Sequence, residues 1–358
     1  SKDSFFQYPF RPFGQTGPGD PVKLNSPYVS AIHIDRQDRI WIGTYFGGLQ
    51  RLDTVENRFI SYPFSMTEKN RLYGNTAAFI FEGSRGKLWI SGRPYNLNFT
   101  FKIPRFSLFD PKTEEVTRFD SNPQKPGSIS QNNVLKIFED SRGLIWLHTF
   151  GGGIDILERR TKRFTHFNHD PKDPTSLGSK QIYTFFEDSA GTIWIGTDSG
   201  ISYYHPMWRK FRSRRLLVKA PYRESNQSVI RILGSNIGRN EAGLLRHVWL
   251  GTEAGLNRWD RQKNRFHFFE VTPKTPDSQP YALYEAPNQI LWVGTGMGLH
   301  RSIPISGSNP SIPVRFETVL PRITGGRGVI TAILPAIDGN LWIASYGLGL
   351  GYYNTTSN

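Results

Sequence analysis

A Trp-containing string that recurs along the chain limits what the chain can fold into. Trp, then Ile, Leu or Val, then Gly, Ser, His or Ala occurs at Trp41, Trp89, Trp146, Trp194, Trp249, Trp292 and Trp342. The intervals between these Trp residues run from 43 to 57 residues. Self-similarity at such a period is the signature of a repeat architecture, in which each repeat is one supersecondary unit. Seven units account for nearly the whole chain.

The third unit shows what one repeat contains. Residues 132–140 alternate apolar and polar side chains as a strand does, and three more strand-like segments follow at 144–149, 154–160 and 163–170. Gly-containing turns separate them, and no helical period is present. Four short strands per unit with Gly turns are typical of propeller blades. The sequence therefore predicts an all-β fold: one seven-bladed β-propeller over residues 1–358, with four-stranded antiparallel blades.

The two ends of the chain complement each other. The last unit offers three strands, whereas residues 4–10 (SFFQYPF) form an orphan strand that is similar to residues 58–64 (RFISYPF), the outer strand of the first unit. We predict that residues 4–10 supply the outer strand of the seventh blade, which removes an unpaired edge there. The large ring of each recurring Trp is expected to fill the space between blades. The Asp of the EDSRG and EDSAG turns is expected to accept backbone N–H bonds.

Composition excludes several classes of protein. The 358 residues contain no Cys, which excludes disulfides, thiolate metal sites and a Cys nucleophile. No run approaches 18 apolar residues, so no membrane span is expected. With 25 Phe, 15 Tyr and 9 Trp, the chain can bury a large core. No cofactor motif is present, and His166-x-x-His169 has no third ligand in view, so we assign neither a cofactor nor a metal.

The net charge is strongly positive, since 44 Lys and Arg face 30 Asp and Glu, giving +14. The bases are spread over all units and no nucleic-acid module is present, which argues against nucleic acid as a partner. Two insertions interrupt the repeat, at 93–105 and at 207–225, and both carry bases among aromatic residues. Each is either a solvated loop or a contact for an anionic partner such as a uronate or sulfated glycan.

Two segments carry a resemblance to a known family. Residues 119–157 and 167–204 resemble the two-component regulator propeller repeat. That family's repeats form periplasmic or extracellular sensor propellers, which precede a membrane span and a kinase or cyclase, and many sense oligosaccharides. The resemblance therefore implies an extracytoplasmic sensor of a bacterial two-component receptor, with a membrane-anchored output domain and a homodimer as partners. Family members typically carry two propellers and a β-sandwich, whereas this chain offers one propeller.

Ligand contacts are expected in loops that share one end of the blades, which we term the top face. These are the loops between second and third strands and the loops entering each first strand. The ligand-binding candidates are Tyr45, Phe46, Arg93, Tyr95, His148, Phe150, Asp198, Glu253, Arg327 and Tyr346. The entering loops also offer Tyr28, Tyr73, Asn75, Asn132, Asn133, Lys180 and Tyr281. Aromatic planes beside polar and basic groups suit an oligosaccharide, neutral or acidic.

Two alternatives to a sensor stay open. Tyr, His148 and Arg on the top face could supply the base and the charge neutralisation of a polysaccharide lyase, although no lyase or hydrolase motif is visible and no catalytic residue is assigned. The top face could also dock a protein partner, in which case it would be flat and apolar.

Overall fold

The computed structural model describes residues 5–10, 21–65, 68, 70–73, 76–92, 106–206, 210–214, 228–235, 246–273, 275–303, 315–321 and 328–355. The chain divides into two compact units, of which unit 1 comprises residues 1–167 and 336–358 and unit 2 comprises residues 168–335. In the described part of the chain the secondary structure is almost entirely β, apart from the short 3-10 helix η2 (Pro276–Ser278). No helix in these residues is long and apolar enough to cross a membrane.

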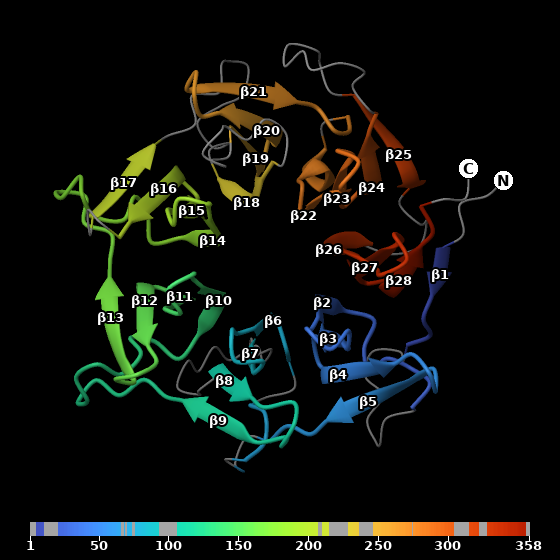
Figure 1. Ribbon diagram of the computed structural model, residues 1–358, viewed down its shortest axis with the longest axis horizontal. Helices are drawn as coiled ribbons and strands as arrows, with labels where there is room; N and C mark the ends of the chain where they lie inside the picture. The colour runs from blue at the N-terminus through green and yellow to red at the C-terminus, as the bar shows by residue number, and fades with distance from the viewer. Residues whose placement is uncertain are drawn as a thin grey trace. The chain divides into compact units, whose positions relative to one another are not determined.

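Unit 1 contains three complete four-stranded antiparallel sheets, each with its strands in sequence order (Figure 1). Blade 1 is β2 (Val29–Ile34), β3 (Ile40–Thr44), β4 (Gly48–Asp53) and β5 (Arg58–Tyr62). Blade 2 is β6 (Phe79–Glu82), β7 (Leu88–Ser91), β8 (Phe106–Phe109) and β9 (Val116–Phe119). Blade 3 is β10 (Val134–Glu139), β11 (Ile145–Thr149), β12 (Gly153–Glu158) and β13 (Arg163–Phe167).

Unit 2 contains three more sheets of the same order. Blade 4 is β14 (Ile182–Glu187), β15 (Ile193–Thr197), β16 (Gly200–His205) and β17 (Lys210–Arg214). Blade 5 is β18 (Val229–Gly234), β19 (His247–Thr252), β20 (Gly255–Asp260) and β21 (Arg265–Phe269). Blade 6 is β22 (Ala282–Glu285), β23 (Leu291–Thr295), β24 (Gly298–Ser302) and β25 (Phe316–Pro321).

The seventh sheet confirms the prediction for the N-terminus. Its order is β1-β28-β27-β26, formed by β1 (Phe5–Gln7), β28 (Gly349–Tyr353), β27 (Leu341–Tyr346) and β26 (Val329–Pro335). The outer strand β1 runs antiparallel to β28, with Phe5 opposite Tyr353 and Gln7 opposite Gly351. Seven four-stranded blades make this an all-β, seven-bladed β-propeller, as the sequence predicts.

The seven recurring Trp residues lie in the second strand of their blades and are core, since none is more than 7% exposed. Trp41 of blade 1 packs edge-on against Phe109 of blade 2, with ring centroids 5.8 Å apart. Within unit 2, Trp194 of blade 4 packs in the same way against Trp259 of blade 5, at 5.1 Å. Burial of such large rings joins neighbouring blades within each unit.

An Asp in the first hairpin of three blades binds the indole of that blade's Trp. Asp35, Asp140 and Asp188 accept the Nε1–H of Trp41, Trp146 and Trp194 at 2.8, 3.0 and 3.0 Å. The other oxygen of each carboxylate accepts two backbone N–H bonds of the turn; for Asp188 the donors are the residues at 190 and 192. The turn Asp is therefore a structural acceptor, as the sequence predicts, and it also fixes the Trp ring.

Unit 2 contains a buried His that should make stability depend on pH. His300 in β24 contacts the hydroxyl of Thr295 through Nε2 at 2.9 Å and that of Thr318 through Nδ1 at 3.0 Å. Burial lowers its pKa from 6.5 to about 4. The unfolded chain therefore binds the proton first, so stability is complete above pH 6.5 and falls as the pH decreases toward 4.

We expect the free energy of unfolding to drop by on the order of 3 kcal/mol across this window. Urea unfolding at a series of pH values measures the drop, and His300→Gln should flatten the profile between these limits. A His300→Gln profile as steep as that of the unmodified protein would contradict the assignment.

Candidate functional site

Four ring-bearing residues from three loops of unit 1 form one cluster, which we term the aromatic group: Tyr28, Tyr45, Phe46 and Tyr346. Tyr28 precedes β2, Tyr45 and Phe46 follow β3, and Tyr346 ends β27. The ring of Tyr28 lies 4.9 Å from that of Tyr346 and 6.3 Å from that of Phe46. Tyr45 lies edge-on to Tyr346 at 5.7 Å, and its backbone N–H donates to the carbonyl of Tyr28 at 2.9 Å. All four side chains are partly exposed.

Phe46 holds a backbone conformation that a bulky residue rarely adopts. Its φ is +68°, whereas the corresponding positions of blades 3 and 7 are Gly151 at +74° and Gly347 at +98°. Left-handed backbone brings the Cβ too close to the following carbonyl oxygen and costs roughly 1–2 kcal/mol. Strain of this kind persists where the surrounding structure over-determines it, which occurs frequently at ligand sites. The sequence keeps a ring at Phe46 at the expense of stability.

The other candidates of unit 1 are placed differently. His148 lies in β11 and is 1% exposed, so it offers no accessible base in this structure. Phe150 is 48% exposed in the β11–β12 turn. Arg93, Tyr95 and the rest of the insertion 93–105 lie outside the described residues.

Unit 2 places the acidic candidates among tyrosines. Burial raises the pKa of Tyr183, and the negative charges of Asp198 and Glu253 raise it further. Burial likewise raises the pKa of Tyr281, as do the charges of Asp277 and Glu253. The Tyr281 hydroxyl donates to Gln279 Oε1 at 2.8 Å. These groups are near enough to interact electrostatically. A carboxylate can accept a hydrogen bond from a sugar hydroxyl, and a neighbouring phenol can donate one to it.

Arg231 in β18 is a cation that the sequence analysis did not single out. It donates from Nη1 to the carbonyl of Ile230 at 2.8 Å, and burial lowers its pKa to about 10 while Tyr281 opposes the shift. Its one sequence signal is an Arg in the otherwise apolar strand VIRIL. Arg327 and most of the insertion 207–225 lie outside the described residues, which include only 210–214 of that insertion.

Among the described residues, no group of three or more His, Asp or Glu side chains is placed to hold a metal ion. His166 Nδ1 instead contacts Asp155 Oδ1 at 2.6 Å, and His169 Nδ1 contacts the carbonyl of Leu177 at 2.6 Å.

Solved structures with the same fold include bacterial extracellular domains. The extracellular domain of BT4673 from B. thetaiotaomicron, assigned to a hybrid two-component system, matches with a TM-score of 0.71 and 16% identity, covering 99% of this chain and 40% of that one. That of BT3049, assigned in the same way, gives a TM-score of 0.66 and 19% identity, covering 93% and 40%. The chain thus spans 40% of the length of each of these two structures.

An enzyme also shares the fold. Virginiamycin B lyase from Staphylococcus aureus matches with a TM-score of 0.61 and 13% identity, covering 92% of this chain and 96% of that one. No protein of curated function matches the chain in sequence.

Sequence comparison identifies the repeat itself. Residues 23–46, 128–151 and 176–199 match the family described as two component regulator propeller. These segments end in the loops that follow β3, β11 and β15, the second strands of blades 1, 3 and 4. The chain therefore carries two-component regulator propeller repeats in three blades of a seven-bladed β-propeller.

Proposed function

We propose that this chain is the extracytoplasmic, ligand-sensing propeller of a two-component-type receptor and that it binds an oligosaccharide at the aromatic group. The matched repeats and the likeness to extracellular domains of two-component systems support a sensor. In such a receptor the partners are a membrane-anchored output domain and a second copy of the chain. Ligand binding would act by favouring one of two arrangements of the receptor.

The aromatic group is the observation that carries the proposal. Three loops from two blades bring partly exposed rings together, and one ring is held by strained backbone at Phe46. The flat faces of such rings stack on the apolar faces of sugars, while the tyrosine hydroxyls bond to sugar hydroxyls.

Two substitutions at Phe46 separate its ring from its backbone strain. Phe46→Ala and Phe46→Gly both remove the ring, but only Gly adopts a φ of +68° without strain. We expect the Gly variant to be more stable than the Ala variant by about 1 kcal/mol, the reverse of the usual order in strands. Urea unfolding of both variants measures the difference. Equal stabilities would show that position 46 is not strained.

The same variants test ligand binding. Thermal unfolding of the full chain is measured against neutral and acidic oligosaccharides at low and moderate salt. A ligand at one hundred times its dissociation constant adds about 2.7 kcal/mol. Both Phe46 variants should lose most of this gain, whereas Phe150→Ala, which removes an exposed ring from the corresponding loop of blade 3, should keep it. If no sugar shifts the transition, or if the Phe46 variants respond fully, sugar binding at the aromatic group is wrong.

A lyase is the second candidate, because virginiamycin B lyase shares the fold over nearly the full length of both chains. The base that the sequence offers, His148, is buried in β11. Following the same sugar panel for time-dependent cleavage decides between the two functions: a sensor binds without consuming the sugar, and a lyase releases unsaturated product.

A further inference from the structure

Blade 2 departs from the hairpin pattern of the three matched blades. Gly83 stands where blades 1, 3 and 4 have Asp35, Asp140 and Asp188. A Cβ at Gly83 would lie 2.6 Å from Arg159 Nη2, 2.9 Å from Glu139 Oε2 and 3.0 Å from Trp89 Nε1. The indole N–H and an Arg guanidinium, which contact the Asp side chain in blade 4, therefore surround a glycine in blade 2.

Trp89 differs from its counterparts in one hydrogen bond. Trp41, Trp146 and Trp194 each donate Nε1–H to the hairpin Asp. Trp89 is only 2% exposed, and its Nε1 has no hydrogen-bond partner among the described residues. A buried N–H without an acceptor costs about 1–3 kcal/mol, so an acceptor supplied from outside would be stabilised here.

Glu139 of blade 3 does not replace the hairpin Asp. Its carboxylate accepts from the N–H and hydroxyl of Ser84 in blade 2. The equivalent Glu82 accepts from the N–H of Arg36 in blade 1, where Asp35 is also present. A Glu and a hairpin carboxylate therefore coexist at this position in the fold, and Glu139, although close to Gly83, does not accept the Nε1–H of Trp89.

An Arg that could bind a further carboxylate is already in position. In unit 2, Arg261 follows β20, contacts Asp188 Oδ2 at 3.0 Å and lies over the ring of Trp194 at 5.0 Å. In unit 1, Arg159 follows β12 in the same way and lies over the ring of Trp89 at 5.6 Å. It donates to Glu139 and Ser84, but a guanidinium has more donors than these two contacts use.

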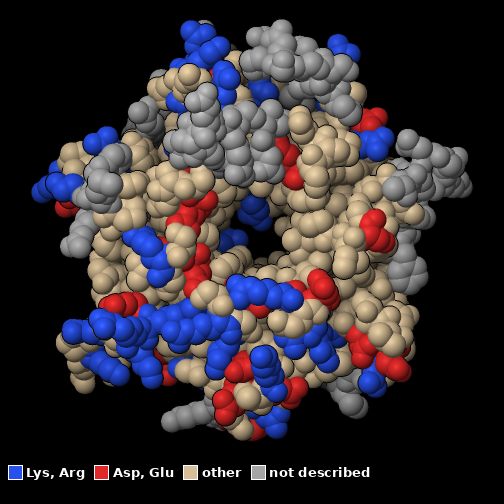
Figure 2. All heavy atoms as spheres, in the orientation of Figure 1, with Lys and Arg blue, Asp and Glu red and all other residues tan. Residues whose placement is uncertain are grey.

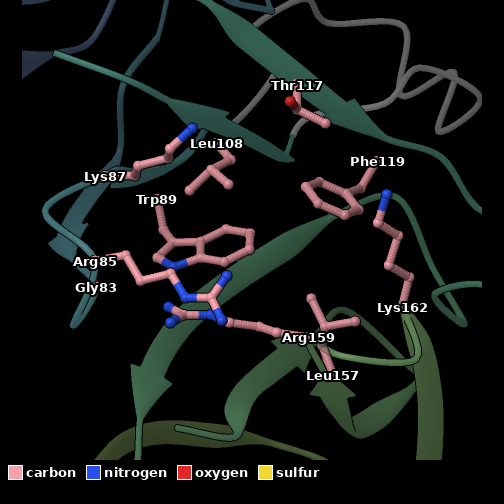
Figure 3. A pocket seen from close by; sticks show the side chains of 10 residues that line it. All are labelled: Gly83, Arg85, Lys87, Trp89, Leu108, Thr117, Phe119, Leu157, Arg159 and Lys162. Atoms are coloured by element: carbon pink, nitrogen blue, oxygen red, sulfur yellow. The ribbon is translucent and has the colours of Figure 1, made fainter. Parts of the chain in front are cut away.

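A pocket of about 270 Å³ opens at this position, between blades 2 and 3 (Figure 3). Arg85, Lys87, Arg159 and Lys162 line it; of these, Lys87 pairs with Asp110 at 2.9 Å and Arg159 with Glu139 at 2.7 Å. Its remaining lining is mainly apolar: Trp89, Leu108, Phe119 and Leu157 with Gly83 and Thr117. In Figure 3, Lys162 lies beside Phe119, on the other side of the pocket from Arg85. Such a lining suits a molecule with an anionic end and an apolar body.

We propose that this pocket binds a small organic acid with an aromatic or alkyl body. Its carboxylate accepts the Nε1–H of Trp89 and pairs with Arg159, as Asp188 does with Trp194 and Arg261. Its body lies against Leu108, Phe119 and Leu157. Lys and Arg gather on the face of unit 1 shown in Figure 2, over the region that holds β9 and β13, and this field favours the approach of an anion.

The site is separate from the aromatic group. It lies at the β6–β7 and β12–β13 hairpins, whereas the aromatic group lies at loops that follow second strands, at the other end of the blades. Binding of an organic acid here therefore does not depend on sugar binding.

The test uses 3-(4-fluorophenyl)propionate as a ¹⁹F NMR probe of the full chain, with the matched amide as a neutral analogue. We expect the carboxylate to bind at least about tenfold more tightly than the amide, because a charge-assisted contact is lost in the amide. Trp89→Phe keeps an aromatic ring, although a smaller one, and removes the N–H donor; Arg159→Gln removes the charge. Both should weaken carboxylate binding by about tenfold or more. Arg159→Gln should leave amide binding nearly unchanged, whereas Trp89→Phe should weaken amide binding as well, because the amide carbonyl also accepts the Nε1–H.

Gly83→Asp is the decisive variant because it supplies the carboxylate from within the chain. It should abolish binding of the carboxylate probe while keeping or raising the thermal unfolding temperature, which shows that the variant is folded. Arg71→Gln is the matched control, since Arg71 pairs with Glu68 and does not line the pocket. Equal affinities for acid and amide, full binding by Gly83→Asp, or no binding of the acid at millimolar concentration would each overturn the proposal. Inorganic phosphate that competes as well as the acid would overturn the part assigned to the apolar lining.

Discussion

Deletion of residues 1–10 is expected to lower the free energy of unfolding by about 5 kcal/mol. The deletion removes β1 and with it the antiparallel pairing to β28. It also removes Tyr8, whose ring stacks on Trp342 at 6.1 Å and packs edge-on against Phe59 of blade 1 at 5.7 Å. Loss of a well-packed aromatic ring alone costs about 3–5 kcal/mol. Urea unfolding monitored by Trp fluorescence measures the change.

The deletion should also expose the backbone of β28 as a free edge. Such an edge pairs with other chains, so the variant is expected to self-associate more than the parent, as sedimentation would show. Gln7→Ala serves as the control, because it removes one side-chain hydrogen bond to the carbonyl of Leu348 and leaves the strand intact. An unfolding midpoint unchanged by the deletion would mean that β1 contributes nothing to the seventh blade.

Asp140→Ala should have the second largest effect, a loss of about 4 kcal/mol, because breaking a buried, charge-paired network costs about 3–5 kcal/mol. The Asp140 carboxylate accepts from Trp146 Nε1, from the backbone N–H groups of Arg142 and Leu144, and from the Arg142 guanidinium. Alanine leaves these donors without their acceptor while Trp146 stays buried. Denaturant unfolding gives the value.

Two matched variants show whether the loss of stability comes from the hydrogen bonds of Asp140 or from its charge. Asp140→Asn keeps a carbonyl acceptor and is expected to lose less than Asp140→Ala. Asp53→Ala removes an Asp that also accepts two backbone N–H bonds in a hairpin but contacts no Trp, and it should cost less than either. If Asp140→Ala and Asp53→Ala proved equally mild, the turn Asp would not be fixing the Trp ring.

Acid should weaken the same network at Asp35. Burial opposes ionisation there, but hydrogen bonds from Trp41, Arg39 and Gln37 outweigh it and hold the pKa below its usual value of 3.8. The contribution of Asp35 is therefore present above this value and is lost as the pH falls through the lowered pKa. This window lies below that of His300, so the two groups can be told apart in one pH series.

The fold was predictable because its determinants are local. Period-two strands, Gly turns and the Trp string recur in each blade, and the match between residues 4–10 and 58–64 is enough to assign the outer strand of the seventh blade. Loop position also singled out Tyr28, Tyr45 and Tyr346 as candidates for ligand contact, and their rings lie together in the structure. Each of these inferences rests on the sequence pattern of single blades and requires no knowledge of which distant residues touch in the folded chain.

His148 shows where such reasoning fails. Its position ends the Trp string, where blades 1 and 4 have Gly43 and Gly196. A Cβ on either glycine would lie 2.3 Å from a backbone oxygen of the next blade, so these positions are packed. Aligning the blades could have indicated that His148 is buried, and the same alignment would have shown Phe46 in a glycine position. An alignment of the blades could not have predicted the pocket, because only the structure shows that the hairpin Asp accepts the Nε1–H of Trp.

The hairpin Asp has a consequence for how repeat proteins acquire new responses. An acidic group held by the chain and one carried by a diffusing molecule make the same contacts, and they differ in effective concentration. When Gly replaces Asp in one blade, the carboxylate contact to Trp is no longer always present. It then forms only when an acid binds, so its occupancy follows the concentration of that acid. Blades 1, 3 and 4 keep the Asp and its bond to Trp. In a duplicated hairpin, a single codon change can therefore convert a structural contact into a response to a ligand while other blades keep theirs.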